Sequence, residues 1–179
     1  MYILILVLCD RPYLVYEYVM IHGITTDSEY DYCSGKSECI PCSADNYNLE
    51  LCGRKLSPPS CDINENQRCN HINIYSKISS WLAVQPLNET QLIDVLYNIG
   101  PLSVAMASDE LQYYKSGIFD STTCDPIELD HAIVIVGYTS DAYIVKNSWG
   151  MDWGENGYFR VARNKNTCGI ASVVTTAII

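Results

Sequence analysis

The sequence contains signals for both helices and strands, which predict a fold that combines the two kinds of element. An apolar run at 131–136, rich in β-branched residues, predicts a buried strand. A second strand-like stretch at 142–146 follows a Thr-Ser-Asp turn, so the two strands are expected to form an antiparallel hairpin. Helices are predicted at 13–21 and at 88–99.

The helix at 88–99 has clear start and stop signals. Asn88 is expected to cap it, with Gln91 in the reciprocal position of a capping box, and the Gly-Pro pair at 100–101 ends it. Asn88 also begins the only plain N-glycosylation sequon, Asn-Glu-Thr, and both interpretations stay open. One face of the helix has to be buried, since its apolar residues recur at three- and four-residue spacing: Leu92, Ile93, Leu96 and Ile99.

Composition limits the possible partners. The chain has 179 residues, 48% of them hydrophobic, which is enough for one domain or two small lobes. A net charge of −10 argues against nucleic acid and anionic membranes as partners. The apolar start at 1–8 lacks basic residues and a cleavage site, so we expect a buried strand, or sequence joined by a gene-model or truncation event, rather than a signal peptide.

Cysteine usage indicates an oxidising compartment. Nine cysteines are present, and six of them lie in a polar, loop-rich stretch that cannot bury much: Cys33, Cys39, Cys42, Cys52, Cys61 and Cys69. A zinc site is the competing interpretation, since 39–42 is a C-x-x-C, but neither a second such spacing nor a paired His follows. We expect three disulfides, in any of fifteen connectivities, with no metal and no cofactor.

His131 and Asn147 are the candidate catalytic residues. The end of a buried strand is a rigid mount for an imidazole, which can act as a base near neutral pH. The predicted hairpin brings Asn147 beside it, where the amide can hold the ring. Each residue alone is more often structural, so only the combination indicates a site.

Three motifs together resemble the papain family of cysteine peptidases: His-Ala and an apolar strand ending in Gly-Tyr at 131–138, Lys-Asn-Ser-Trp-Gly at 146–150, and Trp-Gly-Glu-Asn-Gly-Tyr at 153–158. The resemblance runs from about Pro12 to Ile179. It implies that His131 is the general base to a cysteine and Asn147 orients it. Trp149 would support the pair by shielding their hydrogen bond from water.

The resemblance also implies an architecture and a pocket. The fold would be the papain-like α+β arrangement with two lobes: an incomplete, cysteine-rich helical left lobe at 1–73 and an antiparallel β-rich right lobe at 74–179. A peptide would lie between them, with its second side chain in a hydrophobic pocket lined by Ala105, Ala132 and Val173. In the family, a disulfide matches Cys124 and Cys168, which leaves Cys9 unpaired and open to another partner.

The sequence departs from the family at the nucleophile. Members place it in a Cys-Gly-(Ser/Ala)-Cys-(Trp/Tyr) motif well before the His, after a Gln that stabilises the oxyanion, and neither feature occurs in these 179 residues. Cys9 is a poor substitute, because Asp, Arg and Pro follow it. It better matches a structural cysteine before a glycine pair, yet here Pro12 replaces a peptide-binding glycine and has no N–H to donate.

Two functions follow as hypotheses. The chain is part of a secreted or lysosomal/vacuolar cysteine peptidase, inactive as it stands, that acts on a peptide or protein once the missing segment is supplied. Alternatively, it is a non-catalytic homologue that serves as a disulfide-rich binding or interaction protein. Neither involves a nucleic acid or a membrane.

Overall fold

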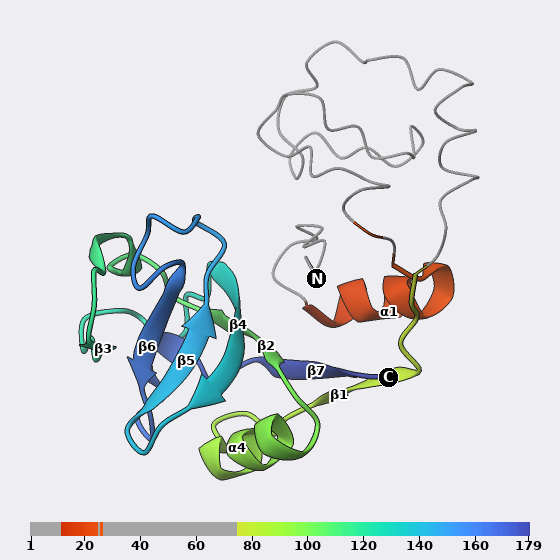
Figure 1. The fold of residues 1–179 in the computed structure, drawn as a ribbon. Helices are drawn as coiled ribbons and strands as arrows, with labels where there is room; N and C mark the ends of the chain where they lie inside the picture. The colour runs from red at the N-terminus through yellow and green to blue at the C-terminus, as the bar shows by residue number, and fades with distance from the viewer. Residues whose placement is uncertain (1–11, 25, 27–74) are drawn as a thin grey trace.

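A computed structural model describes residues 12–24, 26 and 75–179 (Figure 1). One sheet dominates this part of the chain, with strand order β1-β7-β2-β4-β5-β6-β3. All neighbours are antiparallel except the parallel pair β3 and β6. The strands are β1 (Ser80–Ala83), β2 (Leu102–Met106), β3 (Ile118–Phe119), β4 (His131–Tyr138), β5 (Ala142–Lys146), β6 (Tyr158–Ala162) and β7 (Val174–Ile178).

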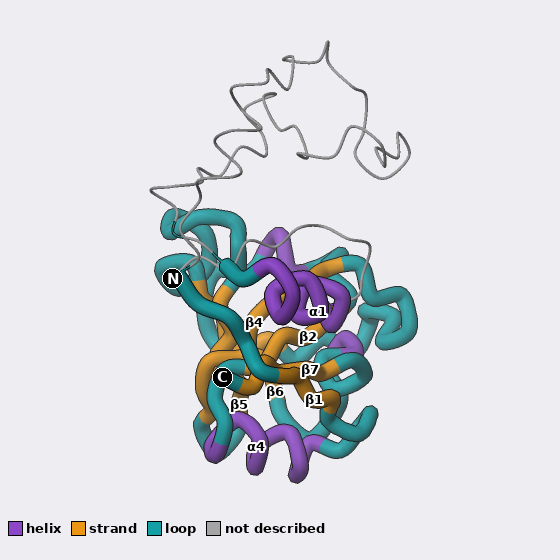
Figure 2. Tube along the Cα trace, turned by 90° about the vertical axis from the view of Figure 1, so that its right-hand side faces the viewer, coloured by secondary structure: helices purple, strands orange, loops and turns teal. Residues whose placement is uncertain are grey.

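Helices complete the described part and confirm the α+β class. They are the α-helices α1 (Pro12–His22) and α4 (Glu89–Asn98) and the short 3₁₀ helices η2 (Leu111–Tyr113) and η3 (Thr167–Gly169). Figures 1 and 2 show α4 at one end of the sheet and α1 beside the ends of β1 and β7. Along the chain, α1, β1 and α4 come first, and strands predominate from β2 onward.

The predicted hairpin is confirmed, with β4 and β5 joined by the turn at 139–141. Ile133 and Ile135 are buried, whereas Val136 on the opposite face is 38% exposed. The expectation of a strand buried throughout was therefore wrong for one face. An antiparallel sheet needs only one face against its core, and the β-branched run does not reveal which residues alternate outward.

Asn88 caps α4 as predicted, because its Oδ1 accepts a 3.0 Å hydrogen bond from the Gln91 N–H. In a capping box the Gln91 side chain would accept from the Asn88 N–H, but here it does not. Gln91 Oε1 accepts from the Gln85 N–H at 2.9 Å, while the Asn88 N–H donates to the Gln85 carbonyl in the preceding turn. That turn occupies the Asn88 N–H and delivers a different donor to Gln91.

The buried face of α4 is narrower than its apolar pattern. Ile99 is the residue after the helix and is 44% exposed, so it lies outside that face. The side chains that pack against the core are the buried Leu92, Val95 and Leu96 and the partly buried Ile93, which was predicted to lie on this face. They join a core built mainly from residues on the buried face of the sheet, which supports the site rigidly.

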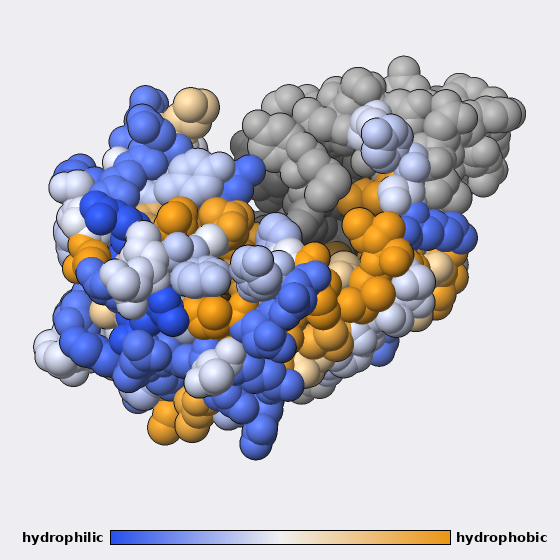
Figure 3. All heavy atoms as spheres, turned by 60° about the horizontal axis from the view of Figure 1, so that its bottom comes forward, coloured by the Kyte–Doolittle hydropathy of each residue, from blue (hydrophilic) through white to orange (hydrophobic). Residues whose placement is uncertain are grey.

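Helix α1 begins at Pro12, where the fixed φ of proline suits a first helical position. It contacts the sheet through two tyrosines. Tyr13 stacks on Trp81 with ring centroids 5.4 Å apart, and the buried Tyr16 donates its hydroxyl to Ser103 Oγ at 2.7 Å. Hydrophobic residues reach the surface on the right of Figure 3, the side where α1 and the ends of β1 and β7 lie.

Several predictions concern residues outside the described part. Cys9, the six cysteines at 33–69, the apolar start at 1–8 and most of the expected left lobe belong to this group. The division into lobes at 73 and 74 stays a prediction.

Candidate active site

The hairpin brings the two candidate catalytic residues together. His131 opens β4 and pairs across the sheet with Met106 of β2. Asn147 directly follows β5, and its N–H donates to the Gly157 carbonyl at 2.9 Å. Although the two residues are 16 positions apart, His131 Nε2 lies 2.9 Å from Asn147 Oδ1. Adjacent strand ends therefore fix both groups.

The surrounding donors define the tautomer of His131. Asn147 Oδ1 also accepts from the Ser148 N–H at 2.8 Å, which identifies this atom as the oxygen of the amide. An amide oxygen can only accept, so His131 Nε2 must carry the proton in this hydrogen bond. In the neutral ring, Nδ1 is then the nitrogen with a free lone pair. The arrangement presents a base at Nδ1.

Trp149 lies against this pair. Its ring stacks on His131 with centroids 4.8 Å apart and planes at 29°. Trp149 is in turn edge-on to Trp153, which contacts Phe159 in the core. Asn147 is only 8% exposed, so its hydrogen bond to His131 lies in a region of reduced dielectric.

The turn after Trp149 is held by a residue to which sequence reasoning gave no role. Glu155 accepts from the Gly117 N–H at 2.9 Å and from both Nε and Nη2 of Arg160. The guanidinium of Arg160 is the main cause that lowers the pKa of Glu155 to about 2. Arg160 is five residues from Glu155 in sequence, whereas Gly117 is 38 residues away, so Glu155 joins this turn to a distant segment.

The backbone approaching His131 is fixed from two sides. The Asp130 N–H donates to the Met106 carbonyl at 3.2 Å, and Asp130 Oδ1 accepts from the Ser108 N–H at 2.8 Å. Upstream, Cys124 is joined to Cys168 by a disulfide, the pair that the resemblance implied. These restraints limit the movement of the backbone that carries the imidazole of His131.

The backbone conformation and close packing at position 169 require a glycine after Cys168. Its φ is +81°, and a Cβ there would lie 2.6 Å from the Pro126 carbonyl oxygen and also against the Leu129 side chain. Only glycine allows η3 to pack this closely on the loop that leads to His131.

The three predicted pocket residues lie together. Ala105 and Ala132 are directly opposite in the β2–β4 register, and the Ala105 N–H donates to the Val173 carbonyl at 3.3 Å. Ala105 is 4% exposed, while Ala132 and Val173 are half-buried. Ala132 directly follows His131 in β4, so the three residues lie close along the chain and the sheet to the candidate base.

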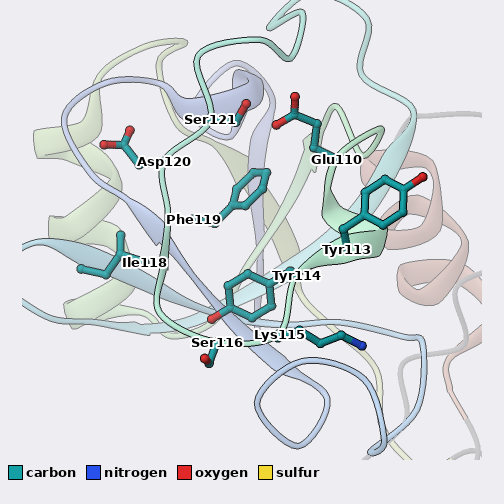
Figure 4. Close-up of a pocket in the computed structure, with 9 residues that line it drawn as sticks. All are labelled: Glu110, Tyr113, Tyr114, Lys115, Ser116, Ile118, Phe119, Asp120 and Ser121. Atoms are coloured by element: carbon teal, nitrogen blue, oxygen red, sulfur yellow. The ribbon is translucent and has the colours of Figure 1, made fainter.

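A separate surface hollow of about 610 Å³ surrounds Phe119. Figure 4 shows Glu110 and Tyr113 on one side of the ring and Lys115 extending away from it. None of the predicted site residues lines this hollow.

Within residues 75–179 and the described part of 12–26, no group of three or more potential ligands could hold a metal ion. No helix in those same ranges could cross a bilayer.

Fold and site together are typical of the thiol-peptidase class, with an imidazole and an amide in contact at neighbouring strand ends. The family model described as "Papain family cysteine protease" matches residues 9–178. The chain belongs to that family.

Relatives with known names agree. The chain is 44% identical over 119 residues to cysteine proteinase 1 of Dictyostelium discoideum, covering 62% of this chain and 34% of that protein. It is 32% identical over 170 residues to a cathepsin L-like proteinase of Fasciola hepatica, covering 92% and 44%. The chain thus spans less than half the length of these relatives.

Solved structures show the same fold. The bromelain protease of Ananas comosus aligns with a TM-score of 0.67 and 25% identity, covering 93% of this chain and 68% of that one. A digestive procathepsin L 3 of Tenebrio molitor aligns with a TM-score of 0.66 and 28% identity, covering 92% and 47%.

Proposed function

We propose that this chain carries the general base and the orienting amide of a cysteine peptidase, and that these 179 residues do not cleave peptide bonds on their own. The observation that supports the proposal is the 2.9 Å contact between His131 Nε2 and Asn147 Oδ1, stacked under Trp149. The nucleophile motif of the family does not occur in the sequence.

The geometry indicates which atoms act once a cysteine faces the site. His131 Nδ1 takes the thiol proton, and the thiolate sulfur attacks the substrate carbonyl carbon. The imidazolium then returns that proton to the leaving amine as the peptide C–N bond breaks. Asn147 Oδ1 accepts the Nε2–H throughout, so the ring keeps its orientation in both charge states.

Without the thiol these residues have nothing to activate. Members of a catalytic triad act as a unit, so loss of the nucleophile removes nearly all the acceleration that the others provide. Peptides or proteins are the proposed substrates, in a secreted or lysosomal compartment, since the relatives include cathepsins and digestive proteinases. Ala105, Ala132 and Val173 favour a hydrophobic substrate side chain, because their own surfaces are small and apolar.

The test has two stages. The purified chain is first incubated with a fluorogenic peptide and with a thiol-directed peptide probe, and we expect neither cleavage nor labelling. A chimaera is then made by placing before this chain the segment of the Fasciola hepatica relative that precedes the matched region. It should cleave the peptide, and His131→Ala should abolish that activity.

Asn147→Ala in the chimaera should lower kcat by at least tenfold, while Asn98→Ala, an exposed amide on α4, should leave it unchanged. Probe labelling of Cys9 in the original chain would contradict the proposed inactivity. A folded chimaera without activity would instead favour the non-catalytic binding protein, an alternative supported by Pro12, which opens α1 and has no N–H for a peptide.

A further inference from the structure

The sequon at 88–90 lies on the surface at the start of α4. Thr90 is exposed and Asn88 is half-buried. Glu89, between them, points the other way: its Oε2 accepts from the Tyr143 hydroxyl at 2.7 Å and its Oε1 from the Asn166 N–H at 2.8 Å. The middle residue therefore anchors the segment, while the two residues that define the sequon stay available.

The two ends of the Asn88 amide have different tasks. Oδ1 caps α4 by accepting from the Gln91 N–H at 3.0 Å. Nδ2 has a much weaker contact, 3.5 Å from Gln85 Oε1 on the surface. An N-linked sugar attaches to the nitrogen and leaves the carbonyl oxygen as an acceptor. The capping and glycosylation interpretations of the sequence are therefore compatible.

We propose that Asn88 is an N-glycosylation site whose cap survives the modification. The co-reactant is a lipid-linked oligosaccharide diphosphate of the secretory pathway. Asn88 Nδ2 forms a bond to the anomeric carbon, the bond from that carbon to the diphosphate oxygen breaks, and the lipid diphosphate leaves. Nδ2 loses one proton, and nothing is oxidised or reduced.

The surroundings of Asn88 suit a carbohydrate. Leu87 is 63% exposed, and a sugar on the next residue shields this apolar side chain from solvent. A shallow hollow adjoins the sequon, with polar side chains at 164–166 on its other wall. Asn164 and Lys165 there can hydrogen-bond to the hydroxyls of the first sugar.

The position also leaves the candidate active site open. Glu89 contacts Tyr143, and Tyr143 pairs with Tyr138 at the end of β4. His131 is at the start of β4, seven residues away, which is roughly 20 Å along a strand. Figure 1 likewise shows α4 at one end of the sheet.

The test uses the full chain behind a heterologous signal peptide, translated with endoplasmic-reticulum microsomes. Glycosylation is scored only on chains protected from added protease, so entry into the lumen is required independently of the proposed localisation. Unmodified chain and Thr90→Ser should show one endoglycosidase-sensitive mass shift. Asn88→Gln and Thr90→Ala should show none, and adding Asp120→Asn, which creates an Asn-Ser-Thr sequon on an exposed turn, should restore it in the Asn88→Gln background.

Protected chains that lack the shift, or a shift that persists in Asn88→Gln, would overturn the proposal.

A second measurement tests whether the N-terminal cap of α4 survives glycosylation. Hydrogen exchange at the Gln91 amide should be equally slow with and without the glycan and at least tenfold faster in Asn88→Ala. Faster exchange on glycosylation would show that cap and sugar compete. Peptidase activity is not involved, so failure here leaves the proposed function untouched.

Discussion

The β-rich region and helix α1 are held in different ways. The sheet has a continuous core in which Tyr143, Phe159 and Ile135 are fully buried. Among the described side chains of α1, only Tyr16 is buried, and Tyr18 and Ile21 are exposed. The candidate catalytic residues lie on the region with the core. Their geometry therefore depends on packing that α1 does not supply.

This contrast predicts two levels of stability. Regions with many buried apolar contacts open only with global unfolding, whereas peripheral elements open at lower cost. We expect the sheet and α4 to unfold cooperatively and α1 to detach first. Two substitutions test this difference, and a third tests an ion pair on the β-rich region.

The largest effect is expected in the core. Phe159→Ala removes a fully buried ring that packs on Tyr114 and Trp153, and should lower the free energy of unfolding by about 3–5 kcal/mol. Tyr113→Ala, at a 76% exposed ring, should have little effect. Urea denaturation of both variants checks this, and similar losses would mean that the sheet has no dominant core.

A smaller effect is expected where α1 meets the sheet. Tyr16→Phe removes the hydroxyl that donates to Ser103, which should weaken this contact by about 1 kcal/mol. Hydrogen exchange at 12–22 should accelerate while exchange in β4 and β5 stays the same. Tyr97→Phe, an exposed tyrosine on α4, is the control. Equal acceleration throughout the sheet would contradict the two-level description.

The smallest effect concerns pH. Because the pKa of Glu155 falls from 4.5 to about 2 in the folded chain, its ion pair with Arg160 contributes stability above pH 4.5 that is lost as the pH falls toward 2. Glu155→Gln should remove this part of the acid sensitivity, a modest change because solvent screens a partly exposed pair. Unfolding curves between pH 2 and 6 measure it, and identical pH slopes for both proteins would refute it.

Local sequence signals made much of the fold and of the candidate active site predictable. The hairpin and the contact of His131 with Asn147 depend on two strand-like stretches joined by a short turn, which the sequence contains in one segment. Long-range partners were not predictable. Gln91 bonds to Gln85 because of a turn that the cap pattern does not encode, and Glu155 holds Gly117 across 38 residues. Which face of β4 is exposed depends on which elements pack against the strand in the folded chain, and the β-branched run does not encode this.

The most direct test of the central claim is the protonation of His131, measured by long-range ¹H–¹⁵N correlation NMR on the folded chain. The neutral ring should carry its proton on Nε2, with Nδ1 unprotonated. Asn147→Ala should shift both nitrogen resonances and speed exchange of the Nε2 proton, whereas Asn98→Ala should not. A proton on Nδ1, or nitrogen shifts unaffected by Asn147→Ala, would contradict a base already oriented by its amide.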